Sequence, residues 1–218
     1  MFSGNCFTLV ASPNHKKTII MNKLYATVIM VAGASILSIQ AMAIKFKVLG
    51  GSMDAVKNET QLNVVYDYSK MAVGKFDDEA DYISKKKSDY NEKEAGRGES
   101  WAKAWKADRS KRFEPTFEEL FNKHSEKTKV GSYPSAKYTL IFKTTFTEPG
   151  FNVHVMRKNA SIDGEFWVVE TANQGHVIAK VQMSDAPGRT FGGYDYDTGA
   201  RIEECYAMAG KSFAKKYF

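Results

Sequence analysis

The order in which the hydrophobic pattern changes along the chain is the feature that most restricts its fold. Two short runs that alternate apolar and polar side chains come first, a long charged stretch with helical spacing follows, and four more alternating runs precede a final helical stripe. The expected strands are residues 44–48, 62–68, 138–147, 151–155, 162–171 and 176–183. This order predicts an α+β two-layer sandwich, with one mixed or antiparallel sheet of about five to six strands and helices packed on one face.

The charged stretch over residues 77–127 is expected to form three helices. Residues 94–98 contain two glycines and interrupt the first helix. Ser100 is the expected N-cap of the second helix, and Pro115 suits the first turn of the third. In the later strands, Asn173-Gln174-Gly175 predicts the turn of a hairpin.

A segment that resembles an export signal precedes the first strand. Lys23 is followed by an uncharged apolar run from Leu24 to Ile39, and Ala41-Met42-Ala43 matches the small-x-small pattern of a cleavage site. The run is shorter than the roughly 20 residues of a membrane-spanning helix, which favours a cleaved signal over an anchor. We therefore expect a signal peptide at residues 21–43 and a location in the periplasm or outside the cell.

Three consequences follow for the organisation of the chain. Residues 1–20 are interpreted as an upstream extension that results from a misassigned start, and residues 44–218 as a single α+β domain that begins at Ile44. Cleavage removes Cys6 and leaves Cys205 as the one cysteine of that domain, so no intramolecular disulfide can form. The apolar residues around Cys205 predict a buried, inert thiol. No membrane span is expected after cleavage.

The charge of the exported domain is modest. The whole chain carries a formal charge of +6, and removal of Lys16, Lys17 and Lys23, with no acidic residue lost, leaves +3. A basic face for nucleic acid is therefore not expected, and export argues further against one.

Four short segments carry a resemblance to a known group of proteins. They are Asp-Tyr-Ser at 67–69, Thr-Glu-Pro-Gly-Phe-Asn-Val at 147–153, Tyr-Asp-Thr-Gly-Ala-Arg-Ile at 196–202 and Gly-Lys at 210–211. On these segments the chain resembles a family of uncharacterised secreted proteins from Gram-negative gut anaerobes; the resemblance extends over essentially the whole of residues 44–218 and implies no activity. The element order is also similar to that of small periplasmic α/β domains in envelope lipoproteins and in activators of cell-wall synthases, which is a likeness of fold and not of chemistry.

The turn before the last helix is the first candidate site. Asp195-x-Asp197-x-Gly199 is similar to the opening of a calcium loop, but Ala200 stands where the tight-turn glycine is needed. Tyr206 stands at the position of the bidentate glutamate, so the pattern fails a second time. The preferred interpretation is that Asp197 or the following Thr198 caps the helix.

Arg201 in the first turn of that helix opposes the helix dipole, so we expect it to reach back to Asp195 or Asp197. With Tyr194, these residues form the expected binding turn. The helix that follows is expected to bury the stripe Ile202, Cys205, Tyr206, Ala209 and Phe213.

The remaining chemistry-bearing residues are scattered. His124, His154 and His176 lie far apart, without a cysteine or carboxylate at ligand spacing, so no metal and no cofactor is expected. Trp101 and Trp105 share one helical face, either packed on the sheet or exposed as an aromatic platform.

Two functions remain open at this stage. The preferred hypothesis is a non-enzymatic binding or interaction module for an envelope protein or a glycan, with Trp101 and Trp105 among the candidate binding residues. The alternative is a carboxylate-based hydrolase acting on an envelope or glycan substrate. It would use Asp67, Asp195 and Asp197, which would then have to converge in one pocket at separations of about 5–10 Å.

Overall fold

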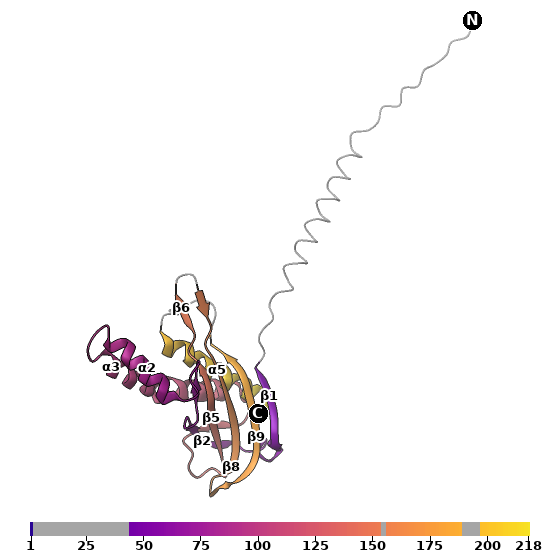
Figure 1. Cartoon of the computed structure of the whole chain (residues 1–218). Helices are drawn as coiled ribbons and strands as arrows, with labels where there is room; N and C mark the ends of the chain where they lie inside the picture. The colour runs from indigo at the N-terminus through magenta and orange to yellow at the C-terminus, as the bar shows by residue number, and fades with distance from the viewer. Residues whose placement is uncertain (2–43, 154–155, 189–196) are drawn as a thin grey trace. The chain divides into compact units, whose positions relative to one another are not determined.

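A mixed seven-stranded sheet organises the protein (Figure 1). The computed structural model describes residue 1 and residues 44–153, 156–188 and 197–218. The compact unit that carries the sheet spans Met42–Phe218. The predicted signal peptide and the upstream extension lie outside the described residues, apart from Met1.

The order of strands across the sheet is β1-β9-β8-β5-β2-β4, and β3 pairs with β5 beyond the end of β2. Strand β2 runs parallel to β4 and β5, and β3 runs parallel to β5, whereas the pairs β5–β8, β8–β9 and β9–β1 are antiparallel. The strands are β1 (Lys45–Gly51), β2 (Gln61–Asp67), β3 (Ala72–Val73), β4 (Lys129–Gly131), β5 (Tyr138–Glu148), β8 (Ser161–Glu170) and β9 (Asn173–Pro187). A separate hairpin consists of β6 (Phe151–Val153) and β7 (Met156–Lys158).

The predicted α+β class and the mixed sheet are confirmed. The sheet has more strands than expected because β3 and β4 have two and three residues and are too short to show an alternating pattern. The longer strands follow the alternation closely: Leu62 and Phe142 are fully buried, whereas Val65 on the opposite face is 39% exposed.

Helices cover one face of this sheet. The helical elements are the 3-10 helix η1 (Met53–Val56), α2 (Glu79–Asn91), α3 (Arg97–Asp108), the π-helical turn η2 (Arg109–Phe113), α4 (Glu114–His124) and α5 (Thr198–Tyr217). Helix α5 passes behind the strands in Figure 1 and contacts β8 and β9, and α4 packs against α5. Within the described residues, no helix is long and apolar enough to cross a membrane.

The second helix begins earlier than the sequence predicts. Its N-cap is Gly96, with φ of 83°, and Ser100 lies inside the helix, where its hydroxyl donates to the Gly96 carbonyl at 3.1 Å. Gly98 explains the early start, since a Cβ at this position would lie 2.4 Å from the Lys87 carbonyl oxygen of α2. The two helices can therefore cross closely, and the prediction of Ser100 as N-cap is wrong. Pro115 lies in the first turn of α4, as predicted.

The β8–β9 hairpin also turns earlier than expected. Glu170 pairs with Asn173, so Thr171 and Ala172 form the turn and Asn173–Gly175 begin β9. The Thr171 amide donates to the Lys137 carbonyl at 3.0 Å, which ties the turn to the segment before β5 and places it three residues before Gly175.

Stacked aromatic rings form the centre of the core. The ring of Phe166 lies 4.4 Å from that of Phe142 and 3.9 Å from that of Phe213 on α5, centroid to centroid. The Tyr206 ring stacks on Phe113 at 5.1 Å, and its hydroxyl shares a 2.6 Å hydrogen bond with Thr144. The predicted stripe of α5 is buried throughout, and burial raises the pKa of the Cys205 thiol.

Candidate functional site

An open recess of about 400 Å³ lies where β2 ends and α2 begins. The carboxyl ends of the parallel strands β2, β3 and β5 meet at this edge of the sheet, which is where open sheets with parallel strands commonly bind ligands. The lining residues are Tyr66, Asp67, Tyr68, Ser69, Met71, Asp78, Glu79, Ala80, Ile83, Lys106 and Arg109. They come from β2 and the loop that follows it, from the N-cap and first turns of α2, from α3 and from the first residue of η2.

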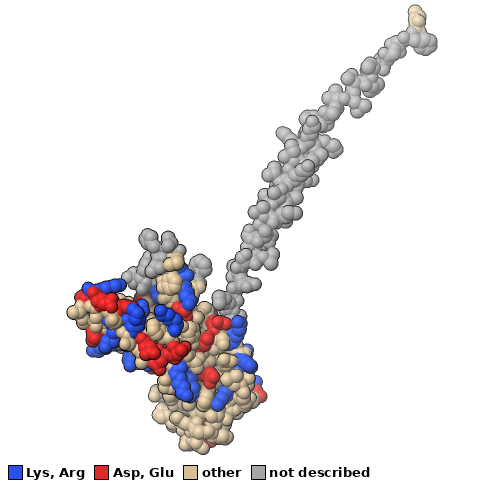
Figure 2. Space-filling view, viewed as in Figure 1, with Lys and Arg blue, Asp and Glu red and all other residues tan. Residues whose placement is uncertain are grey.

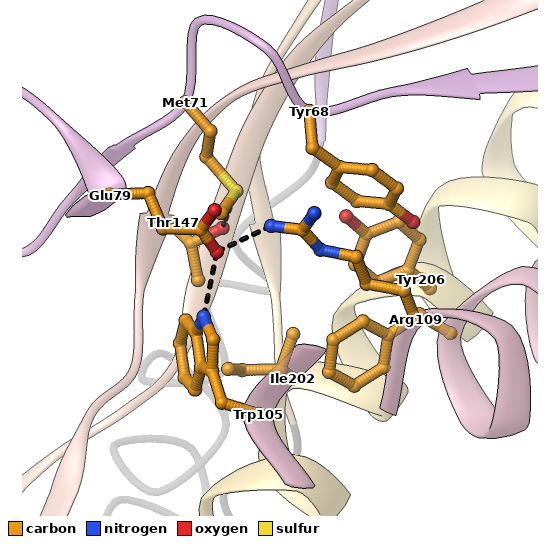
Figure 3. A pocket seen from close by; sticks show the side chains of 9 residues that line it. Tyr68, Met71, Glu79, Trp105, Arg109, Thr147, Ile202 and Tyr206 are labelled. Carbon is orange, nitrogen blue, oxygen red and sulfur yellow. Dashed lines mark hydrogen bonds and ion pairs between the residues drawn. The ribbon is translucent and has the colours of Figure 1, made fainter. Parts of the chain in front are cut away.

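The floor of the recess is an ion pair held by aromatic side chains (Figure 3). Glu79 in the first turn of α2 pairs with Arg109, and its Oε1 also accepts a hydrogen bond from Trp105 Nε1 at 2.7 Å. The Arg109 guanidinium lies 4.1 Å from the centre of the Tyr68 ring, a cation–π distance. The side chains of Glu79 and Arg109 are 14% and 21% exposed, so both charges are largely withdrawn from water.

A small cavity of about 10 Å³ lies directly below this pair. Figure 3 shows it between Met71, Thr147, Ile202 and Tyr206. This volume is about that of one water molecule, so the cavity is an internal space and not a ligand site.

Two tyrosine–glutamate pairs support the recess from the side of α4. The Tyr66 hydroxyl donates to Glu118 Oε1 and the Tyr68 hydroxyl to Glu114 Oε1, both at 3.2 Å. Burial raises the pKa of Glu114 and of Glu118 above the usual range, although the tyrosine hydrogen bonds act in the opposite direction. The sequence patterns do not single out these glutamates, because their partners are about fifty residues away in β2 and its following loop.

Asp67 lies at the mouth of the recess and is ionised. Its carboxylate accepts a hydrogen bond from the Ser69 amide at 2.9 Å and pairs with Lys143 of β5 at 3.3 Å. Hydrogen bonds from Ser69, together with Lys143, lower the pKa of Asp67. The carboxylate is therefore fixed in one orientation at the edge of the cavity.

The turn before α5 has a separate set of contacts. Asp197 is the N-cap of α5, as predicted, and accepts from the Gly199 amide at 2.8 Å. Its other oxygen pairs with Arg112 Nη1 at 2.6 Å. Burial alone would raise the pKa of Asp197, but the hydrogen bonds from Arg112 and Gly199 outweigh it and lower the pKa.

Arg201 is buried, with 7% exposure, and holds a turn of the chain in place. It donates to the carbonyl oxygens of Pro149 and Gly150, each at 3.2 Å, and to the Thr198 hydroxyl at 3.0 Å. The Asp197 carboxylate pairs with Arg112, and Arg201 meets Asp197 through its amide, which donates to the Asp197 carbonyl at 3.2 Å. The predicted contribution of Tyr194 and Asp195 lies outside the described residues.

Trp101 and Trp105 pack within the helical hairpin of α2 and α3 and not on the sheet. Their rings stack 5.6 Å apart, and Tyr82 of α2 approaches them at 5.8 and 5.1 Å. Their shared face is therefore turned toward α2, which corrects the expectation of packing on the sheet. Trp105 is 7% exposed and touches the recess through Glu79, whereas Trp101 is half-buried.

The nominated carboxylates that the structure describes bind different cations: Asp67 pairs with Lys143 and Asp197 with Arg112. Asp67 lines the recess beside β2 and Asp197 binds Arg112 at the start of α5, while Asp195 lies outside the described residues. His154 likewise lies outside them, and His124 and His176 are on α4 and β9. Among the residues that the structure describes, no group of three histidine, cysteine or acidic side chains is arranged to hold a metal ion.

Fold and site thus define an α+β protein with a polar recess at the carboxyl end of its parallel strands. No protein-family model matches the sequence, and no curated protein matches it. Two solved structures are similar: the PelC dodecamer from Paraburkholderia phytofirmans and a single-substitution variant of it. They are 10% and 9% identical, with TM-scores of 0.35 and 0.32, and each match covers 76% of this chain and 97% of the PelC chain. Values this low carry no information on activity or partners.

Proposed function

We propose that this protein is an exported, non-enzymatic binding module that holds a polar ligand in the recess between β2 and α2. The observation that carries this proposal is the recess itself. Its volume of about 400 Å³ falls within the range of small-molecule sites, and its charged side chains are held in fixed positions.

The fixed positions of these groups favour binding. Asp67 is held by Ser69, Asp78 accepts from the Ala80 amide at 2.6 Å, and Glu79 is held by Trp105 and Arg109. Side chains that are already ordered lose little conformational entropy when a ligand binds.

The lining favours a glycan over a protein partner. Most of the lining is polar: carboxylates, cations, a serine and two tyrosines line the cavity, with Met71, Ala80 and Ile83 as its apolar members. Such polar groups bind the hydroxyls of a sugar, whereas charged residues are depleted at the centre of a protein interface. Large apolar side chains that are exposed, such as Val48, Leu49, Phe151 and Met156, lie on other elements.

A substitution that fills the recess tests this proposal. Ala80 is exposed in the first turn of α2 and lines the cavity, so Ala80→Trp is expected to abolish binding of envelope oligosaccharides and leave the fold intact. Ala104→Trp, at an exposed position of α3 that is not part of the lining, is the matched control. Binding is measured by saturation-transfer NMR. Equal binding by both variants would show that the recess is not the binding site.

The hydrolase alternative is favoured by one observation, the position of the Asp67 carboxylate in the lining of the recess. The other lining carboxylates have structural roles, since Asp78 caps α2 and Glu79 neutralises Arg109. Release of reducing ends from the same oligosaccharides, lost in Asp67→Asn, would establish the enzyme in place of the binding module.

Export is the second part of the proposal and rests on the apolar run and the Ala41-Met42-Ala43 pattern. Intact-mass measurement of protein recovered from the periplasm or the medium is expected to give a chain that begins at Ile44. A mass that still contains residues 24–39 would contradict cleavage.

A further inference from the structure

The recess continues into a second depression along α2, and together they form one groove. The second depression, of about 470 Å³, is lined by Ala80, Ile83, Ser84, Lys87 and Lys106. It shares Ala80, Ile83 and Lys106 with the recess at the end of β2. Positions 83 and 84 lie three and four residues after position 80 and four and three before position 87, so the four α2 residues share one face of the helix, with Lys106 of α3 beside them.

The two halves of the groove differ in charge. In the inner half the acidic groups have internal partners, as described above. The charged side chains that line the outer half are Lys87 and Lys106, both cations. Lys87 is also 3.4 Å from Glu99, whereas Lys106 is exposed and has no ion pair among the described residues. The outer half therefore attracts an anionic group.

We propose that the groove binds an acidic oligosaccharide, with a carboxylate of a uronic acid at Lys106 and Lys87 and neutral hydroxyls in the inner half. This inference rests on the proposed function and adds the charge and orientation of the ligand. Residues 80 to 87 rise about 10 Å along the helix axis, so the groove is long enough to hold more than one sugar ring. Ile83 and Ala80 in the shared middle give an apolar strip for the carbon face of a sugar ring.

The experiment compares short oligogalacturonates with their methyl esters, which share the same backbone and lack the charge. Isothermal titration calorimetry with residues 44–218 is expected to show about tenfold tighter binding of the acid, the usual worth of one charge-assisted contact at a solvated site. Added salt is expected to remove that preference, since it screens exposed charges.

Three variants test whether Lys106 causes the preference for the acid over its methyl ester. Lys106→Ala is expected to bind acid and ester alike, Lys106→Arg to retain the preference, and Lys103→Ala, exposed on the same helix outside the lining, to behave as the unmodified protein. Equal binding of acid and ester by the unmodified protein would overturn this inference while the recess proposal stands. Binding of neither sugar would count against both proposals, and tighter binding of an oligoglutamate peptide would assign the groove to an acidic protein segment instead.

Discussion

The sheet with α4 and α5 and the helical hairpin of α2 and α3 are held together in different ways. In the first region aromatic rings stack in a dry core, with Phe142, Phe166 and Phe213 at the centre. In the second region a tryptophan pair and the Glu79–Arg109 pair connect polar helices. Figure 2 shows the same contrast on the surface, where charged side chains crowd the α2–α3 end and the opposite, strand end is mainly uncharged.

This difference indicates how stability and binding are divided. Burial of apolar area is the larger stabilising effect, so the sheet and α5 are expected to set the free energy of unfolding. Paired charges add less stability, but they hold polar side chains in defined orientations, as a ligand site requires. The recess lies where the two regions meet.

The largest expected effect is in the aromatic core. Phe166→Ala removes a fully buried ring between two others and is expected to lower the free energy of unfolding by about 3–5 kcal/mol. Urea denaturation measures this loss. Trp101→Ala, at a half-buried position of α3, is the matched test of the other region and is expected to cost less. An equal loss of stability in both variants would contradict the proposal that the sheet and α5 set the free energy of unfolding.

A smaller effect is expected at the floor of the recess. Glu79→Ala leaves the Arg109 guanidinium and Trp105 Nε1 without their acceptor, which is expected to cost about 2 kcal/mol. Because Arg109 is then free to move, ligand binding is expected to weaken together with stability. Glu79→Gln retains an acceptor for Trp105 and is expected to lower the free energy of unfolding by less. An equal loss would mean that the charge of Glu79 contributes more to stability than its hydrogen bond to Trp105.

The cap of α5 is expected to contribute about 1 kcal/mol, the usual worth of an N-cap. Asp197→Ala removes the acceptor for the Gly199 amide and the partner of Arg112, and thermal unfolding measures the loss. Calcium is expected to leave the melting temperature unchanged. A clear rise with calcium that disappears in Asp195→Ala would mean that this turn is a metal site and not a cap.

The smallest effect is a pH dependence at Glu118. Because burial raises its pKa, the folded chain holds this proton to higher pH than the unfolded chain. Its contribution to stability is therefore complete below the ordinary glutamate pKa and is lost as the pH rises through the raised pKa. Glu118→Gln keeps an acceptor for Tyr66 but carries no charge, so its stability relative to the unmodified protein is expected to increase as the pH rises above the ordinary glutamate pKa. Glu119→Gln, exposed on the same helix, is the control, and parallel curves would contradict the assignment.

The elements with regular periodicity were predictable from the sequence. The alternation in β2 and β5 and the stripe of α5 reflect which face meets the core, and this depends on neighbours within a few residues. The start of α3 was not predictable in this way. It depends on Gly98 fitting against the Lys87 carbonyl, a contact between two helices that the pattern of one helix does not contain.

The site was less accessible to sequence reasoning than the fold. Trp101 and Trp105 share a face, as their spacing predicts, but nothing local shows that this face meets α2. Glu79 and Arg109 are thirty residues apart and come together because α2 and α3 fold back on each other. The signal that could have found them is weak: Glu79 lies in the first turn of one predicted helix, and Arg109 lies one turn after Trp105 in the next.

The position of α5 in the chain has a consequence for how the protein reaches its native state. Phe213 and Tyr206 complete the core, yet they follow every strand in sequence. Helix α4 covers part of the aromatic face of the sheet through Phe117, but the cover is complete only when α5 packs beside it. A chain in which α5 has not yet packed exposes this apolar surface, and such intermediates are prone to aggregate.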